Sequence, residues 1–348
     1  MIKHIVFSGG GSGGHVVPAI TLIKKLQSQG FAISYIGSKQ GIEKKLIQEQ
    51  LIPYYEIATG KLRRYFSIQN FIDPFKIVFG VLQAFCLLFP LNRKQTLVFS
   101  TGGFVSVPVV VAARFLGFKV FIHEQTSRVG LANKIAGKFA TKVFVSFEAS
   151  KKFFKADKVD LSGYPVRDEC FDSVIRSKMI SKINLEDIKK PILFVTGGGN
   201  GSLLLNEAVL KEMKELKEKY FIFHQVGAQF VKDFEKHNDE NYQSFGFLTD
   251  GMIDLYKSAD LIISRAGAGT VCELIALGKA SVFVPLKIAQ FNEQWHNACE
   301  ARDKLGSLLF TEDEFKNIKI SELAIKKANV KSLNSNASKT IVEAIRNV

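Results

Sequence analysis

Short apolar runs alternate along the chain with glycine-containing turns and with stretches in which apolar residues recur at helical spacing. From Ile5 the sequence reads IVFSGGGSGGHVVPAI, and the same order returns from Leu193 as LFVTGGGNGSLLLNEAV. Each stretch predicts a buried strand, a tight loop and an amphipathic helix. Strands that alternate with helices form parallel sheets through right-handed crossovers. The pattern therefore predicts an α/β protein.

A second pair of stretches extends the likeness between the two halves. Residues 96–125 and 259–290 each read as a strand, a small-residue loop, a helix, a glycine, a strand and a polar loop. We predict two Rossmann-like, doubly wound parallel-sheet domains, 1–163 and 164–334, with a boundary in LSGYPVRDE. The tail, 335–348, predicts an amphipathic helix that packs back on the first domain.

The glycine loops are candidate anion sites, since ligands of open parallel sheets bind beyond the carboxyl ends of the strands. Gly9, Gly11 and Gly14 fit the dinucleotide pattern G-x-G-x-x-G, but the second strand ends in Gly37 and Ser38 without the acidic residue that would hold a ribose. The lysine of a P-loop is also missing. What remains is a close backbone approach and a helix N-terminus, both of which favour an anion.

The second half offers a similar loop in SRAGAGT, where Arg265 stands beside the glycines. Glu273 lies one helical turn further on, where it would accept hydrogen bonds from a ribose or stabilise the helix dipole. The sequence contains no Asp-x-Asp pair, which metal-dependent transferases use to clamp a diphosphate. We therefore expect no metal and no cofactor, and helix ends with basic side chains to meet the diphosphate charge.

The charge balance favours an anionic partner. Lys and Arg outnumber Asp and Glu by 47 to 33, giving a net charge of +14. Nucleic acid, an anionic membrane surface or a phosphorylated substrate would suit this charge, and so would a lysine-rich composition with no partner at all. The four cysteines form no CxxC pair, which predicts reduced thiols in the cytoplasm. The N-terminus reads as a strand and not as a signal peptide.

One apolar run allows two interpretations. Residues 77–92 carry no charge, but a membrane-spanning helix needs about 20 apolar residues. The run predicts a helix after Pro74 that is either buried in the core or exposes an apolar face to anionic lipid. The exposed face would consist of Phe75, Phe79, Leu82 and Phe85. The basic rim would consist of Lys61, Arg63, Arg64, Lys76, Arg93 and Lys94.

Four stretches together carry a family resemblance: GGGSGGHVVPA; STGGFVSVPVVVAA with VFIHEQ and GLANK; SGYPVR; and SRAGAGTVCELIALGKASVFVPL with NEQWHNA. They resemble the MurG family of peptidoglycan N-acetylglucosaminyltransferases, in order and over nearly the whole chain. The resemblance implies a GT-B fold, in which two Rossmann-like domains face a deep cleft.

The implied reaction is an inverting transfer of GlcNAc. The donor is UDP-GlcNAc, and the acceptor is the C4 hydroxyl of MurNAc in undecaprenyl-diphospho-MurNAc-pentapeptide (lipid I), which becomes lipid II. The resemblance also implies a peripheral protein on the cytoplasmic face of the bacterial membrane, with other wall-synthesis proteins as partners and without nucleic acid.

The family motifs point to His15 as the general base, with Glu124 and His123 as the other candidates. An unperturbed histidine pKa of about 6.5 suits proton transfer at neutral pH, although His15 is also placed to cap or pack a helix. The resemblance assigns Glu273 to ribose, Gln294 to the GlcNAc hydroxyls and Leu248 to uracil. The full set of substrate-binding candidates is Ser12, Gly13, Gly14, Thr126, Asn133, Arg167, Gly199, Asn200, Leu248, Arg265, Ala268, Gly269, Thr270, Val271, Glu273 and Gln294.

Three positions depart from the family pattern. Thr126 stands where asparagine is frequent, Gly199 stands where serine is frequent, and Glu293 stands where many members have a different polar residue. These changes affect single hydrogen bonds and not the implied reaction. Two other functions compete with the transferase. A UDP-GlcNAc 2-epimerase or another GT-B transferase would share the two-domain fold. A nucleic-acid-binding protein is supported by the charge alone.

Overall fold

The chain divides into two compact units. The computed structural model describes residues 1–60, 69–248, 250–289, 292–325 and 337–348. The first unit comprises Met1–Val166 with Ser335–Val348, and the second comprises Arg167–Asn334.

The first unit is built on a parallel sheet of seven strands in the order β3-β2-β1-β4-β5-β6-β7. Its strands are β1 (His4–Gly9), β2 (Ala32–Ser38), β3 (Tyr54–Ile57), β4 (Thr96–Gly102), β5 (Lys119–Glu124), β6 (Lys142–Val145) and β7 (Val159–Leu161). Its helices are α1 (Gly13–Gln27), α2 (Ile42–Gln48), α3 (Gln69–Leu88), α4 (Ser106–Phe115), α5 (Leu131–Phe139) and α13 (Ala337–Arg346). A 3-10 turn, Glu148–Phe153, precedes β7.

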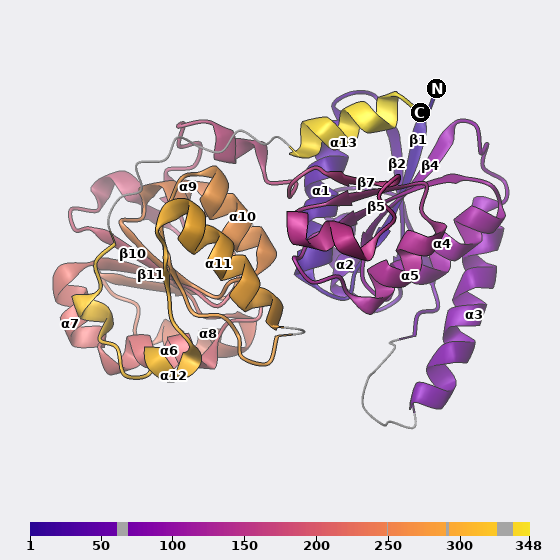
Figure 1. Cartoon of the computed structure of the whole chain (residues 1–348). Coiled ribbons are helices and arrows are strands. Elements are labelled where there is room, and N and C mark those ends of the chain that lie inside the picture. Colours follow the sequence, from indigo (N-terminus) through magenta and orange to yellow (C-terminus); the bar gives the residue numbers. More distant parts are fainter. Residues whose placement is uncertain (61–68, 249, 290–291, 326–336) are drawn as a thin grey trace. The chain divides into compact units, whose positions relative to one another are not determined.

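Both faces of this sheet are buried because consecutive apolar residues of each strand point to opposite sides. On β1, Ile5 and Phe7 join the apolar cluster under α1, α2 and α13, whereas Val6 joins the cluster under α3, α4 and α5. The α13 helix contributes Ile341 and Ile345 to the first cluster and lies against α1, as Figure 1 shows.

The second unit repeats the plan with six parallel strands in the order β12-β11-β10-β13-β14-β15. They are β10 (Ile192–Thr196), β11 (Phe221–Gln225), β12 (Tyr242–Phe245), β13 (Leu261–Ser264), β14 (Val282–Phe283) and β15 (Leu308–Leu309). The helices are α6 (Leu203–Lys211), α7 (Met213–Lys219), α8 (Val231–Glu235), α9 (Met252–Ser258), α10 (Ala268–Ala276), α11 (Glu293–Leu305) and α12 (Glu312–Phe315). A small hairpin, β8 (Met179–Ile180) and β9 (Ile183–Asn184), precedes the sheet.

The two sheets share one strand order. In each sheet, the first strand in chain order has the second and third strands on one side. On its other side lie the fourth to seventh strands in the first unit and the fourth to sixth in the second. This is the doubly wound order of Rossmann-like domains, so the predicted fold class of two Rossmann-like parallel sheets is confirmed. The first strand and its neighbour, β1 with β4 and β10 with β13, form the switch point of each sheet.

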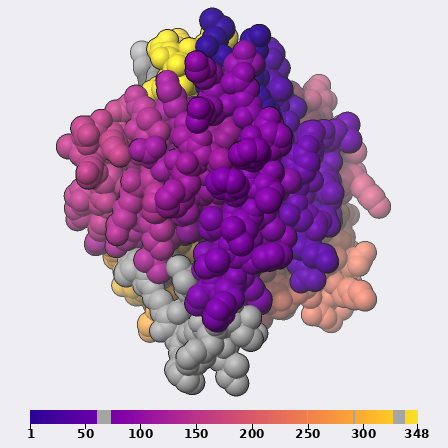
Figure 2. Space-filling model, turned by 90° about the vertical axis from the view of Figure 1, so that its right-hand side faces the viewer, coloured from indigo at the N-terminus to yellow at the C-terminus, as the bar shows by residue number. Residues whose placement is uncertain are grey.

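Helix α3 packs on α4 but leaves much of its own surface in solvent. Ala84 and Leu88 are buried, whereas Phe75 is 77% exposed, Phe79 56% and Leu82 58%. A Cβ at Gly80 would lie 2.1 Å from the Ala58 carbonyl oxygen, so glycine allows the helix to approach the end of β3. The surface of α3 faces the viewer in Figure 2, in the purple range of the bar. The interpretation of this run as a buried core helix is therefore wrong.

Two further findings concern the apolar run. The helix begins at Gln69 and contains Pro74, although the sequence predicts a start after the proline; one proline costs the helix one main-chain hydrogen bond and does not stop it here. Of the predicted basic rim, Lys61, Arg63 and Arg64 lie outside the described residues. Among the described helices, none has the length and apolar character that crossing a bilayer requires.

Candidate functional site

Two loops meet at the switch point of the first unit. The loop after β1 leads into α1, and the loop after β4 leads into α4. Gly103 has φ +83°, and a Cβ there would lie 2.0 Å from the Gly10 carbonyl oxygen, so only glycine permits the contact. Ser12 occupies the N-cap of α1 without a side-chain cap bond, and Gly13 and Gly14 form the first turn. The first backbone N–H groups of α1 are thus available to a ligand.

A buried carboxylate that the sequence analysis missed shapes the first loop. Glu43 has no exposed surface, and its carboxylate accepts hydrogen bonds from Gly11 N at 3.1 Å and from Ser38 N at 3.2 Å. It also accepts one from the Ser38 hydroxyl. Glu43 comes from α2, 32 positions beyond Gly11, so no local pattern links the two residues.

His15 lies on the first turn of α1 and is only partly buried. Its Nδ1 is 2.9 Å from the Thr101 carbonyl oxygen and 3.1 Å from Gln125 Oε1. The ring packs beside Gly103, where a Cβ would lie 3.1 Å from His15 Cδ2. Strand ends β4 and β5 therefore fix one edge of the imidazole.

Glu124 ends β5 and is almost fully buried. Its Oε1 accepts from Thr126 N and Oγ1, both at 2.9 Å, and its Oε2 accepts from Asn133 Nδ2 at 2.9 Å. Burial raises the pKa of Glu124, and these hydrogen bonds and the nearby His15 oppose that rise. The structure thus brings Thr126 and Asn133 together around Glu124, whereas His15 is bonded to Thr101 and Gln125.

His123 is fully buried beside Gln125. Its Nε2 lies 3.0 Å from the Gly163 carbonyl oxygen, and its Nδ1 lies 3.2 Å from Gln125 Nε2. Burial lowers the pKa of His123 to about 4, so the ring is neutral near pH 7. A buried neutral ring has no access to a substrate hydroxyl, which argues against His123 as the base.

In the second unit, two glycine loops again follow the strands at the switch point. The loop after β10 contains Gly199 and Asn200 and leads into α6, whose N-cap Ser202 accepts a hydrogen bond from Leu205 N. The loop after β13 leads into α10, whose N-cap Gly267 has no side chain to offer. The first turn of α10 consists of Ala268, Gly269, Thr270 and Val271, and its N–H groups suit an anion.

Arg167 and Glu273 form a bidentate ion pair. Arg167 Nε donates to Glu273 Oε1 at 2.8 Å, and Arg167 Nη2 donates to Oε2 at 2.9 Å. The Glu273 side chain is 6% exposed and that of Arg167 is 29% exposed. Burial alone would lower the pKa of Arg167, but the charge and hydrogen bonds of Glu273 outweigh it and raise that pKa. Sequence reasoning proposed both residues without predicting that they pair.

Arg265 bonds to three segments of the second unit: the N-cap of α6, the chain after β14 and helix α12. Its Nε donates to Ser202 Oγ at 2.9 Å, and its Nη1 lies 3.0 Å from the Val284 carbonyl oxygen and 2.7 Å from Glu312 Oε1. Burial lowers the pKa of Arg265, and Glu312 opposes that shift. In the described conformation this guanidinium is engaged by the protein itself, next to the N-cap of α6.

The remaining residues that the sequence assigns to UDP-GlcNAc lie on neighbouring segments of the same unit. Gln294, on α11, accepts a hydrogen bond from Leu286 N at 3.0 Å. Asn297 of the same helix donates to the Ala266 carbonyl oxygen at 3.2 Å, which holds α11 to the loop after β13. Leu248 is half-buried after β12. A Cβ added at Gly199 would lie 3.6 Å from Cε2 of the preceding residue, Phe247.

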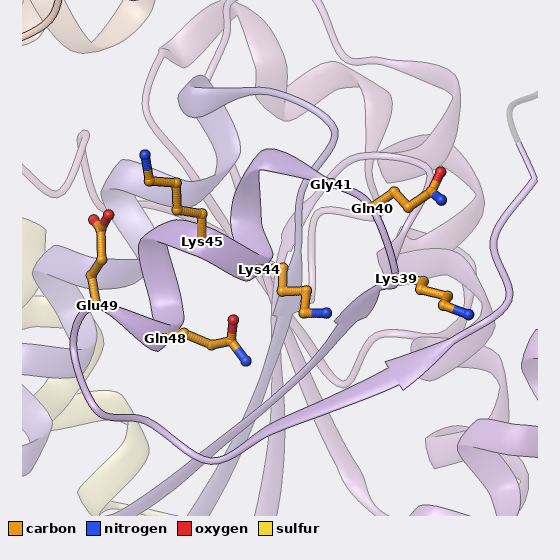
Figure 3. Close-up of a pocket in the computed structure, with 7 residues that line it drawn as sticks. All are labelled: Lys39, Gln40, Gly41, Lys44, Lys45, Gln48 and Glu49. Carbon is orange, nitrogen blue, oxygen red and sulfur yellow. The ribbon is translucent and has the colours of Figure 1, made fainter.

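A separate surface hollow of about 500 Å³ lies beside α2. Its lining residues are Lys39, Gln40, Gly41, Lys44, Lys45, Gln48 and Glu49. Figure 3 shows that their side chains extend in different directions and do not converge on one point. None of the substrate-binding candidates lines it. Within the described parts of the chain, no group of three or more His, Cys, Asp or Glu residues is arranged to hold a metal ion.

Comparison with known proteins gives a consistent result. Residues 5–145 match the glycosyltransferase family 28 N-terminal domain, and residues 192–347 match the glycosyltransferase family 28 C-terminal domain. A UDP-N-acetylglucosamine–N-acetylmuramyl-(pentapeptide) pyrophosphoryl-undecaprenol N-acetylglucosamine transferase of Clostridium novyi (strain NT) is 41% identical over 349 aligned residues, covering 98% of this chain and 96% of the relative.

Two solved structures resemble this chain in fold. The crystal structure of MurG from Acinetobacter baumannii is 28% identical, with a TM-score of 0.69 and coverage of 99% of this chain and 100% of that one. The UDP-GlcNAc 2-epimerase from Methanocaldococcus jannaschii has a TM-score of 0.64 and covers both chains completely, but is 13% identical. Likeness to the epimerase therefore shows the fold alone.

Proposed function

The chain belongs to glycosyltransferase family 28, and from that premise we propose that it transfers GlcNAc from UDP-GlcNAc to lipid I, forming lipid II. The observation that carries this proposal is the 41% identity to a transferase of that specificity over nearly the whole length of both proteins. The predicted enzyme class, a glycosyltransferase, is confirmed by the family match.

We assign the acceptor reaction to the switch point of the first unit. The C4 hydroxyl oxygen of MurNAc attacks the anomeric carbon of GlcNAc from the face opposite UDP. The bond from that carbon to the diphosphate oxygen breaks, and the hydroxyl proton passes to His15. The partial exposure of His15 supports this role. Burial counts against His123, and the three hydrogen-bond donors around the buried carboxylate count against Glu124.

We assign the donor to the second unit. Its diphosphate binds the N-terminal turns of α6 and α10, where the N–H groups stabilise the charge that develops as UDP leaves. Glu273 accepts from the ribose hydroxyls while Arg167 holds its carboxylate, because each carboxylate oxygen accepts more than one hydrogen bond. Gln294 contacts the GlcNAc hydroxyls, Leu248 contacts uracil through its backbone, and Arg265 lies by the phosphates.

We assign the face of α3 to membrane contact on the cytoplasmic side. Phe75, Phe79 and Leu82 are each more than half exposed, and Phe89 and Phe115 are 70% and 76% exposed. Phe75, Phe79 and Leu82 recur at helical spacing on α3, and several large exposed apolar side chains on one helix are typical of an interaction site. Lys76, Arg93 and Lys94 supply positive charge beside it for anionic lipid. Contact with other wall-synthesis proteins stays a prediction.

The test is incubation of the purified protein with labelled UDP-GlcNAc and a lipid I analogue, followed by linkage analysis of the disaccharide. We expect a β-1,4-linked GlcNAc-MurNAc product, formed equally well in the presence of EDTA. Formation of UDP-ManNAc from UDP-GlcNAc alone would instead identify an epimerase. Loss of activity in EDTA that is restored by Mg²⁺ would contradict the metal-independent step.

A further inference from the structure

A chain of hydrogen bonds runs from the Gly163 carbonyl to His15 through buried side chains. Gly163 O is 3.0 Å from His123 Nε2, His123 Nδ1 is 3.2 Å from Gln125 Nε2, and Gln125 Oε1 is 3.1 Å from His15 Nδ1. The Thr101 carbonyl oxygen lies 2.7 Å from Gln125 Nε2 and 2.9 Å from His15 Nδ1. His123 and Gln125 are 0% and 2% exposed, so the protein itself sets their partners.

The direction of each hydrogen bond follows from the carbonyl groups, which only accept. Gly163 O requires the proton of His123 on Nε2, and the neutral ring then presents a lone pair at Nδ1. The Gln125 nitrogen faces the carbonyls of Thr101 and His123 at 2.7 and 3.1 Å, as well as that lone pair. All three are acceptors, so the amide NH₂ must point toward them and the amide oxygen toward His15.

His15 Nδ1 therefore faces two oxygen acceptors, Thr101 O and Gln125 Oε1, and must carry a proton. We infer that Gln125 is a positioning residue that, together with the Thr101 carbonyl, fixes His15 in the Nδ1–H tautomer and leaves Nε2 as the atom that takes the acceptor proton. This inference rests on the proposed role of His15 as the base.

The same hydrogen bonds stabilise the positive charge that His15 gains when it takes up the acceptor proton. When Nε2 takes a proton, the ring becomes a cation whose Nδ1–H already donates to two oxygens. Hydrogen bonds with a charged partner are stronger than neutral ones, so these contacts strengthen as the proton arrives. The Glu124 carboxylate, held by Thr126 and Asn133, is an acidic group that interacts electrostatically with His15. Free neutral imidazole has no such constraint on its tautomer.

The direct test measures the tautomer without relying on activity. The protein has six histidines, so ¹⁵N-histidine labelling followed by long-range ¹H–¹⁵N correlation gives a small set of ring signals, and His15→Gln identifies those of His15. We expect the wild-type His15 ring to be protonated at Nδ1 and to carry a lone pair at Nε2. Protonation at Nε2 in the wild-type neutral ring would overturn the inference, whatever any variant does.

Variants then connect the tautomer to turnover. Gln125→Met removes the amide and leaves the Thr101 carbonyl as the remaining one of the two acceptors at His15 Nδ1. We expect a smaller excess of the Nδ1–H tautomer at His15, a decrease in kcat of about 10-fold to 100-fold and an unchanged KM for UDP-GlcNAc. Gln225→Met is the matched control, because Gln225 is also buried at a strand end but donates to Gly198 O in the second unit; it should leave the His15 signals unchanged. An unaltered His15 tautomer in folded Gln125→Met would refute the positioning role. Full turnover in His15→Gln would instead refute the base assignment. The ¹⁵N signals of the wild-type His15 ring would still decide the tautomer.

Discussion

Burial separates the three groups that the sequence offers for proton transfer. His123 has no exposed surface, and Glu124 is 2% exposed and bonded to Thr126 and Asn133, whereas His15 is only partly buried. Proton transfer requires direct contact with the substrate hydroxyl or contact through one water. Among these three residues, His15 is the one that is not buried, which favours it as the base.

Replacement of His15 should therefore affect the chemical step. We expect His15→Gln to lower kcat by about 10²-fold to 10⁴-fold, which is the usual contribution of a general base, with UDP affinity unchanged. Steady-state kinetics and calorimetric titration with UDP measure the two quantities. His4→Gln is the control, because His4 lies in the same unit at the start of β1 and bonds to Ser34 Oγ at 2.9 Å; it should keep full turnover. Equal kcat in His15→Gln and wild type would rule out the base role.

The Arg167–Glu273 pair predicts an asymmetric response to mutation. Arg167→Met leaves a nearly buried carboxylate without its partner, and we expect a loss of about 3 kcal/mol in unfolding free energy. Arg167→Met combined with Glu273→Gln removes that charge and should recover much of the loss. Calorimetric unfolding of the single and double variants measures this coupling.

An exposed pair provides the control for that cycle. Arg302 donates to Asp303 at 2.9 Å with side chains 50% and 64% exposed, so Arg302→Met should lower the unfolding free energy much less than Arg167→Met does. Equal losses in Arg167→Met and Arg302→Met would show that burial does not amplify the first pair.

At the scale of single elements, α3 combines a structural face and an exposed one. Because Phe75, Phe79 and Leu82 are already in solvent, replacing all three with Gln should leave the melting temperature nearly unchanged. If the face contacts lipid, binding to vesicles that contain phosphatidylglycerol should weaken at least about tenfold, since each large apolar side chain contributes about 1.5–3 kcal/mol when buried. Vesicle co-sedimentation measures this change.

The control for α3 is Ile288→Gln, because Ile288 is 86% exposed in the second unit. Its vesicle binding should match that of the wild type. Equal binding by the triple variant and the wild type would show that lipid contact is made elsewhere.

The elements were predictable where the sequence carries a local signal. The runs after Ile5 and Leu193 identify β1, β10 and the glycine loops, because alternation of strand, glycine and helix is a short-range pattern. The start of α3 was not predictable from the sequence. The free energy lost through one proline is smaller than the free energy that the packing contacts of a long helix provide. The Glu43–Gly11 and Gln125–His15 contacts span 32 and 110 positions, and only the tertiary structure creates them.

At the scale of the whole molecule, both units bury a neutral histidine. Burial lowers the pKa of His123 in the first unit to about 4 and that of His224 in the second to about 3. His224 sits between Tyr242 OH at 2.9 Å and Asn206 Oδ1 at 3.1 Å, a fully satisfied core position. The unfolded chain takes up a proton at each site near pH 6.5, before the folded chain does. Stability is therefore present above about pH 6.5 and is lost as the pH falls toward 4.

The two units should respond to acid to different degrees. In the first unit the raised pKa of Glu124 opposes the effect of His123, because the folded carboxylate takes up its proton before the unfolded one as the pH falls. The second unit holds His224, whose lowered pKa corresponds to a loss of about 3 kcal/mol by pH 4. We expect calorimetric scans from pH 7 to pH 4 to show a falling melting temperature, and His224→Gln to flatten that dependence while lowering the value at pH 7. His237→Gln, a half-buried histidine of the same unit, should retain the wild-type slope. A wild-type slope in His224→Gln would mean that other groups control the acid sensitivity.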